Sequence, residues 1–294
     1  MDSRAIIFAS AQYIEAHIRQ PLKLEQLAAD AGFSVYHYCR LFSLYMDMSV
    51  MEYLRRRRLA HAAFDICKGK RILDVAMDYG FESHNGFAKA FRKVYGFAPE
   101  EYRRRTVSHR PIAPNPLEGI PPAKEFAPNI RVEHRDGFYI AGKVIKTGAD
   151  ISSVARSPAL WNQVWLLEEE NKIYAMAHPR QHGEYYISFP METGMYRLVS
   201  CVRIDDPEDV DDGLYIDWVP PGLYGIFSPP PTDGDLAQAV VDTWKYIFDS
   251  WLPNSGYEPD PGGMDYEFYD ERCHGAPFTM DICIPLIEKE NENV

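Results

Sequence analysis

A segment of about 48 residues occurs twice in the first third of the chain. LEQLAADAGFS returns as ILDVAMDYGFES. With one inserted residue the match continues, so that Phe42 corresponds to Phe91 and Tyr53 corresponds to Tyr102. A repeat of this length indicates that the chain uses one supersecondary unit twice within a single domain.

Each copy predicts a short helix, a sharp turn and a second helix. Gly32 and Gly80 stand at the turns, where glycine adopts a positive φ most easily. Ser34 and Ser83 come next, and a hydroxyl at that position can cap the free N–H groups of the second helix. Two helices across a short glycine-containing turn make a helix-turn-helix unit. An all-helical bundle that binds no DNA would share the same turn.

Other features of the repeat favour DNA binding. The second helix of each unit carries long polar side chains that suit base edges in the major groove. Basic clusters follow each unit, at 55–58 and 103–105, as neutralisation of phosphates requires. Four consecutive arginines cover most of a helix circumference, so at least one of them must point away from open solvent. Phosphate contacts are predicted for Arg55, Arg56, Arg103, Arg104 and Arg105.

Charge is divided unevenly along the chain. The net charge of -12 by itself argues against a nucleic-acid binder. Residues 1–105, however, hold 17 Lys and Arg against 12 Asp and Glu, a net of +5, and the remaining residues carry -17. The basic part is the part that holds the repeat. No apolar run approaches the roughly 20 residues of a membrane span, so we expect a cytoplasmic protein with no membrane partner.

Residues 5–105 closely resemble the DNA-binding domain of the AraC/XylS family of transcription activators. The second unit, DYGFESHNGFAKAFRKVYGFAPEEYRR, matches the signature of that family. The resemblance implies two helix-turn-helix units joined by one long helix, roughly Val50 to Lys68, which read successive major grooves of double-stranded DNA. Because the two reading helices are not identical, we expect an asymmetric operator. The resemblance also implies RNA polymerase as a partner. The base-reading positions of the family fall on Tyr36, Cys39, Arg40, His84, Asn85 and Lys89, of which Cys39 departs from the longer polar residue that is more usual there.

The residue pattern changes after the repeat. Six prolines between 105 and 129 indicate an extended, fairly stiff linker. The apolar period then becomes two, as in strands, with helical stretches around 157–169 and 235–251. Both halves of this region run strand, helix, strand, strand. We therefore predict a multidomain chain, with an all-α DNA-binding domain at 1–107, a Pro-rich linker at 108–129 and an α+β domain at 130–294.

Residues 130–290 resemble the GyrI-like effector-binding domains that follow AraC-type domains in Rob-like regulators. The matching segments are IAGK, ALWNQVW, VPPGLYGIF, TWKYIFDSWLPNSGYE, DYEFYDE and MDICIPL. The resemblance implies two β-α-β-β repeats around an antiparallel sheet. It also implies a cleft between the halves, lined by aromatic side chains and one acid that suit flat or cationic molecules. The candidate lining residues are Trp161, Trp165, Tyr224, Trp244, Glu267 and Tyr269.

Three functions stay open for this second domain. We expect a sensor of a small hydrophobic or cationic effector, which makes the chain an effector-responsive regulator and not an enzyme. Hydrolysis of small electrophiles, reported for some stand-alone GyrI-like proteins, is the first alternative, but no recognisable nucleophile-base pair supports it. A protein-binding module is the second, given the net charge of -17. The five cysteines include no C-x-x-C pair, so no metal site is expected, and no cofactor is expected either.

Overall fold

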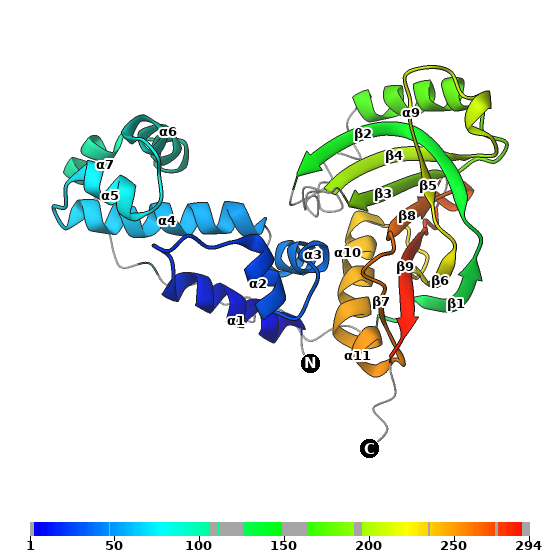
Figure 1. The fold of residues 1–294 in the computed structure, drawn as a ribbon, viewed down its shortest axis with the longest axis horizontal. Helices are drawn as coiled ribbons and strands as arrows, with labels where there is room; N and C mark the ends of the chain where they lie inside the picture. The colour runs from blue at the N-terminus through cyan, green and yellow to red at the C-terminus, as the bar shows by residue number, and fades with distance from the viewer. Residues whose placement is uncertain are drawn as a thin grey trace. The chain divides into compact units, whose positions relative to one another are not determined.

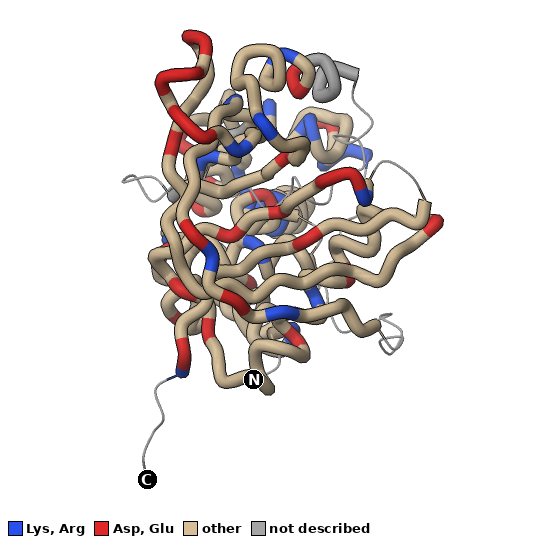
Figure 2. Tube along the Cα trace, turned by 90° about the vertical axis from the view of Figure 1, so that its right-hand side faces the viewer, with Lys and Arg blue, Asp and Glu red and all other residues tan. Residues whose placement is uncertain are grey.

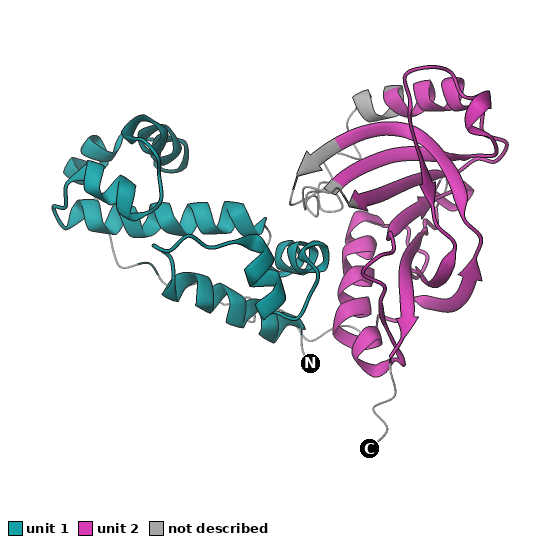
Figure 3. Cartoon of the chain, in the orientation of Figure 1, with its two compact units in different colours: residues 1–120 teal, residues 121–294 magenta. Residues whose placement is uncertain are grey.

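The computed structural model describes residues 3–46, 48–105, 111, 126–148, 164–190, 196–234, 236–273 and 276–289. The chain forms two compact units, residues 1–120 and 121–294 (Figure 3). Most of the predicted linker lies outside the described residues. The first unit is helical and the second contains an antiparallel sheet with helices, as predicted. None of the described helices combines the length and the apolar character that crossing a bilayer requires.

The first unit is arranged along one long helix, α4 (Val50–Cys67), which takes the place predicted for the joining helix. Ser49 caps it, because its Oγ accepts a hydrogen bond from the amide of Glu52 at 3.1 Å. Figure 1 shows three helices near the start of α4 and three near its end. They are α1 (Ser3–Ala16), α2 (Leu24–Asp30), α3 (Val35–Met46), α5 (Ile72–Asp78), α6 (His84–Tyr95) and α7 (Pro99–Arg105).

The two copies of the repeat have the same local geometry. Gly32 and Gly80 both adopt φ +74°, and in both copies the amide after the glycine donates to the carbonyl five residues earlier at 3.0 Å. The Oγ atoms of Ser34 and Ser83 accept hydrogen bonds from the amides three residues later, at 3.3 and 3.1 Å. The positive-φ turns and the serine caps are therefore confirmed, and α2–α3 and α5–α6 are the two helix-turn-helix units.

Packing follows the repeat as well. The rings of Phe42 and Tyr53 meet edge to face with centroids 5.4 Å apart, and those of Phe91 and Tyr102 do so at 5.3 Å. Phe42 and Phe91 are both fully buried. Residues matched on sequence alone thus make the same aromatic contact in each half of the domain, which anchors each reading helix to the helix that follows it.

The second unit is built on a sheet with the strand order β1-β6-β9-β8-β3-β4-β2-β5. All the pairings are antiparallel, and β7 adds to β9 at one side. The strands are β1 (Asn129–Arg135), β2 (Phe138–Gly148), β3 (Glu184–Pro190), β4 (Tyr196–Ile204), β5 (Tyr215–Val219), β6 (Gly222–Ser228), β7 (Tyr257–Pro259), β8 (Tyr266–Tyr269) and β9 (Asp281–Glu288). The helices are α9 (Val164–Ala177), α10 (Leu236–Tyr246), which continues as a π-helix over Ile247–Trp251, and α11 (Leu252–Asn254).

The order of strands shows two equivalent halves, and the edge strand beside each half is the strand that precedes the other half in the sequence. β2, α9, β3 and β4 form one half, and β6, α10, β8 and β9 form the other, which confirms the predicted strand, helix, strand, strand pattern. The halves meet where β3 pairs with β8. Each half is preceded by a strand that joins the sheet beside the other half, since β1 pairs with β6 and β5 pairs with β2.

The two faces of the sheet have different roles. One face holds the main core, which includes Tyr185, Tyr224 and Tyr266. Phe138 on β2 touches Tyr266 on β8 although two strands separate them in the sheet, so the sheet curves strongly around this core (Figure 1). Ile173 of α9 packs on the opposite face. α10 lies on that face too. Its Trp244 contacts Glu267, whose side chain points away from the core face that holds the neighbouring Tyr266.

The sequence analysis ended one helix too early and missed two strands. The helix expected around 157–169 is α9, and its described part runs on to Ala177. The predicted end near Glu169 is wrong, because Ile173 and Ala177 are buried one turn apart and continue the apolar stripe of the helix beyond it. β5 and β7 were not predicted. Both are short, and β7 contains a proline, which weakens a strand pattern.

Candidate DNA interface and effector site

The predicted base-reading residues of the second unit lie on the free side of α6. Phe87 and Phe91 occupy its buried side. His84, Asn85 and Lys89 are exposed, and His84 is the first residue of the helix. A reading helix presents its N-terminal residues to base edges, and His84 and Asn85 are the first two residues of α6. Base contacts from these residues and from Lys89 stay a prediction.

The first unit presents a different surface on α3. Arg40 donates a hydrogen bond to the hydroxyl of Tyr36, and its guanidinium carbon lies 5.6 Å from the centroid of the Tyr36 ring. Tyr36 is buried and Cys39 is 2% exposed. Base contacts from α3 stay a prediction, in which Tyr36 and Arg40 act as a pair rather than separately.

The four-arginine run divides into outward and inward members. Arg55 and Arg56 are exposed and both pair with Glu52, one turn earlier on α4. Arg57 is 14% exposed and pairs with Glu15. Arg58 donates to backbone carbonyls beyond the end of α1. The geometric expectation is therefore confirmed, because two of the four side chains turn away from open solvent.

Glu15 explains why Arg57 is not available to DNA. It also accepts a hydrogen bond from Nε2 of His61 at 2.9 Å. Burial raises the pKa of Glu15, but the hydrogen bonds from His61 and Arg57 outweigh it and lower the pKa to about 2. A carboxylate held charged in this way ties α1 to α4.

The second basic cluster is exposed at the end of α7. Arg103 pairs with Glu100 at 3.0 Å and Arg105 with Glu101 at 2.7 Å. Arg104 is exposed and has no ion pair among the described residues. Exposed pairs of this kind contribute little to stability, so these arginines can exchange a glutamate for a phosphate at small cost.

The sheet domain carries the opposite charge. Figure 2 shows acidic positions recurring along its strands and loops. They include the acidic segment 205–212, DDPEDVDD. Such a surface repels DNA, so the DNA-binding surface must lie on the helical domain.

Glu267 is the central acid of the second domain. It lies in β8 and is 5% exposed. Its Oε1 accepts a hydrogen bond from Nε1 of Trp244 on α10 at 2.9 Å, and its Oε2 accepts one from the hydroxyl of Tyr269 at 3.0 Å. Burial, followed by the negative charge of Glu267, raises the pKa of Tyr269 well above its usual value. Tyr269 therefore stays a neutral donor.

Further aromatic groups continue from this acid toward α9. Tyr186 on β3 is the direct cross-strand neighbour of Glu267. Its ring meets that of Tyr269 edge to face at 5.7 Å, and its hydroxyl donates to Glu170 on α9 at 2.7 Å. Phe248 stacks with Trp244 on the α10 side. Sequence reasoning missed Tyr186 and Glu170, because the pairing of β3 with β8 cannot be read from one strand alone.

The structure brings only some of the predicted lining residues together. Trp244, Glu267 and Tyr269 form one cluster, as described. Tyr224 lies on the opposite face, because it belongs to the core that contains Tyr266, and Tyr266 alternates with Glu267. Trp161 lies outside the described residues, and Trp165 is described only as part of α9.

Comparison with known proteins agrees with both halves of the chain. The family model described as "Helix-turn-helix domain" matches residues 27–105, and the model described as "Integron-associated effector binding protein" matches residues 131–286. Among solved structures, the chain is similar to an integron cassette protein from the mobile metagenome of Vibrio cholerae. Its identity is 18% and its TM-score 0.36, over 55% of this chain and 97% of that one.

Two curated relatives share the helical domain. The regulatory protein SoxS of Salmonella typhimurium is 35% identical over 106 residues, which cover 36% of this chain and 99% of SoxS. The right origin-binding protein of Escherichia coli is 37% identical over 105 residues. That match spans 35% of this chain and only 36% of the relative.

Two helix-turn-helix units on one long helix, followed by a sheet domain that matches an effector-binding family, define a two-domain DNA-binding transcription regulator. The chain belongs to the AraC/XylS family through its first domain, and its second domain is of the GyrI-like, integron-associated effector-binding type. Of these two relatives, one is named a regulatory protein and the other an origin-binding protein.

Proposed function

We propose that this regulator is a cytoplasmic activator whose second domain senses a hydrophobic, cationic effector. A single chain binds an asymmetric operator through α3 and α6, and RNA polymerase is the partner that an activator requires. The observation that carries the sensor proposal is the buried Glu267 carboxylate, held by Trp244 and Tyr269 at the junction of two equivalent halves.

The chemistry of this cluster favours a cation. A carboxylate away from water attracts a positive charge more strongly than an exposed one, because screening by solvent is weaker there. The faces of Trp244, Tyr186 and Tyr269 add their own attraction for a cation. Neutral aromatic donors orient Glu267 without neutralising it, so a bound cation still finds a negative charge.

Glu267→Gln tests this proposal, since it removes the charge and keeps the shape. We expect the affinity of the full chain for the cationic dye crystal violet to fall about tenfold or more, whereas its uncharged leuco form binds nearly unchanged. Intrinsic tryptophan fluorescence reports binding, because all five tryptophans lie in the second domain.

A matched control is Glu258→Gln, which removes an exposed carboxylate from β7. It should leave both affinities unchanged. If neither dye binds the unmodified protein, the sensor proposal fails. If the cation binds but Glu267→Gln and Glu258→Gln behave alike, the assignment of Glu267 fails while a sensor at another site survives.

A further inference from the structure

A closed polar cluster joins the segment between α1 and α2 to the second helix-turn-helix unit across α4. Arg19, just beyond α1, donates from Nη2 to Oδ2 of Asp65 on α4 at 2.7 Å and to the hydroxyl of Tyr79 at 3.1 Å. Tyr79, which follows α5, donates in turn to the same Oδ2 atom of Asp65 at 3.0 Å. Three elements that belong to different parts of the domain therefore meet at one carboxylate.

This cluster is sheltered, which strengthens it. Tyr79 is 2% exposed and Asp65 is buried. Lys70 also donates to Asp65, at 2.9 Å. Burial raises the pKa of Asp65, but the hydrogen bonds from Lys70 and Tyr79 outweigh this effect and lower it, so the carboxylate stays charged. Hydrogen bonds to a charged, sheltered group are stronger than those in water.

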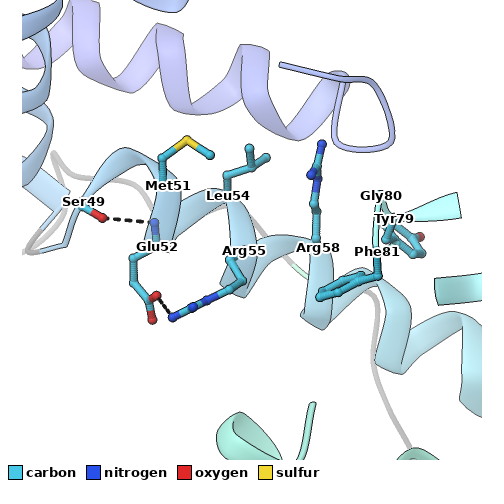
Figure 4. A pocket seen from close by; sticks show the side chains of 9 residues that line it. All are labelled: Ser49, Met51, Glu52, Leu54, Arg55, Arg58, Tyr79, Gly80 and Phe81. Carbon is cyan, nitrogen blue, oxygen red and sulfur yellow. Dashed lines mark hydrogen bonds and ion pairs between the residues drawn. The ribbon is translucent and has the colours of Figure 1, made fainter. Parts of the chain in front are cut away.

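Arg58 makes a second link at the same place. It donates from Nε to the carbonyl of Ile18 at 3.0 Å and from Nη2 to that of Gln20 at 2.7 Å. Its Nη1 lies 3.1 Å from where a side-chain carbon would stand on Gly80, the turn glycine of the second unit. Figure 4 shows Arg58 beside Tyr79 and Gly80, at a surface hollow between α4 and the α5–α6 turn.

The repeat itself points to a special role for Tyr79. The position equivalent to Tyr79 in the first copy is Ala31, within the otherwise matching DAGF and DYGF segments. The phenol that bridges Arg19 and Asp65 is thus present in one copy only. A unit that merely had to fold would not need it, since the first copy makes the same turn without it.

We propose that Arg19, Arg58, Asp65 and Tyr79 form a clamp that fixes the separation and angle between the reading helices α3 and α6. Because α1 packs on α3 and α5 packs on α6, the clamp acts through these neighbours and its members are positioning residues. It sets the spacing between the two half-sites that the chain accepts. This inference rests on the proposed binding of one chain to two half-sites.

DNA geometry makes the spacing a sensitive measure of the clamp. One inserted base pair moves the second half-site by about 3.4 Å and rotates it by about 35°. A rigid protein can follow this change only by straining itself or the DNA. A more flexible connection between the reading helices lowers the strain in the protein and the DNA. The loss of affinity at a wrong half-site spacing is then smaller.

The test uses the full chain and an operator selected with it from a random duplex pool. Versions with one base pair inserted or deleted between the half-sites give the spacing penalty as a ratio of dissociation constants. Tyr79→Phe removes the bridging hydroxyl and keeps the ring. We expect it to reduce the spacing penalty about fivefold, as the loss of one or two hydrogen bonds would, while affinity at the native spacing falls less.

Tyr38→Phe is the matched control. It also removes a buried phenol hydroxyl, one that bonds Ser10 at 2.6 Å between α1 and α3, within the first half of the domain. It should lower the unfolding temperature, and it should reduce the spacing penalty much less than Tyr79→Phe does, because the rest of the packing of α1 on α3 remains. Arg19→Gln, at a half-exposed position, provides a second variant of the clamp should Tyr79→Phe fold poorly.

The outcomes separate the clamp from the proposed function. A spacing penalty that Tyr79→Phe and Arg19→Gln leave unchanged overturns the clamp and assigns the spacing to α4 alone. An unmodified chain that binds all spacings equally overturns it as well. A footprint over a single half-site, by contrast, contradicts the proposed two-site binding itself.

Discussion

Two arginines that look alike in the sequence should differ in what they read. Arg40 is held against Tyr36 on a reading helix, whereas Arg104 is exposed beyond α6 and has no ion pair among the residues described. Arg40→Ala should reduce discrimination at one base pair by about 1–3 kcal/mol, as loss of a bidentate contact does. Arg104→Ala should weaken binding to every sequence and lower the salt slope by about one.

Fluorescence anisotropy on the selected operator, its single-base variants and a random duplex measures both effects at several salt concentrations. Arg180→Ala, which removes an exposed positive charge from the sheet domain, is the control and should change neither quantity. Equal losses for Arg40→Ala on specific and random DNA would place this side chain on a phosphate instead.

At the scale of elements, the two turn glycines offer a direct comparison. Both adopt φ +74°, which costs a residue with a side chain about 1–2 kcal/mol. Nothing lies within 4 Å of the added carbon at Gly32, whereas at Gly80 it meets the guanidinium of Arg58 at 3.1 Å. Gly80→Ala should therefore destabilise the helical domain more than Gly32→Ala, by about 1 kcal/mol, because the Arg58 guanidinium must shift and its hydrogen bonds to Ile18 and Gln20 are weakened. Urea unfolding followed by circular dichroism measures the difference, and equal costs would show that Arg58 moves freely.

These elements also show which features of the fold can be predicted from a single sequence. The repeat predicted both turns and both serine caps, because those features are local. It also matched Phe42 with Phe91 and Tyr53 with Tyr102, but it did not predict the ring contacts that these residues make. The clamp at Tyr79 and the pairing of Tyr186 with Glu267 were not predicted. Each joins segments far apart in the chain, where neither periodicity nor spacing specifies a partner. Tyr224 was grouped with Glu267 for the same reason, although strand alternation places it on the other face.

For the whole molecule, the prediction is one chain on one asymmetric site. The reading helices α3 and α6 carry different side chains, Tyr36 and Arg40 on one and His84, Asn85 and Lys89 on the other, so the two half-sites must differ in sequence. An operator made symmetric by duplicating either half then presents one helix with several wrong base pairs. Each mismatch costs about 1–3 kcal/mol, so such duplexes should bind at least tenfold more weakly than the selected operator.

Native mass spectrometry should find one chain per selected duplex, and footprinting should protect two unequal segments. Two chains on a symmetric duplex, bound as tightly as one chain on the selected operator, would show instead that the protein reads DNA as a dimer.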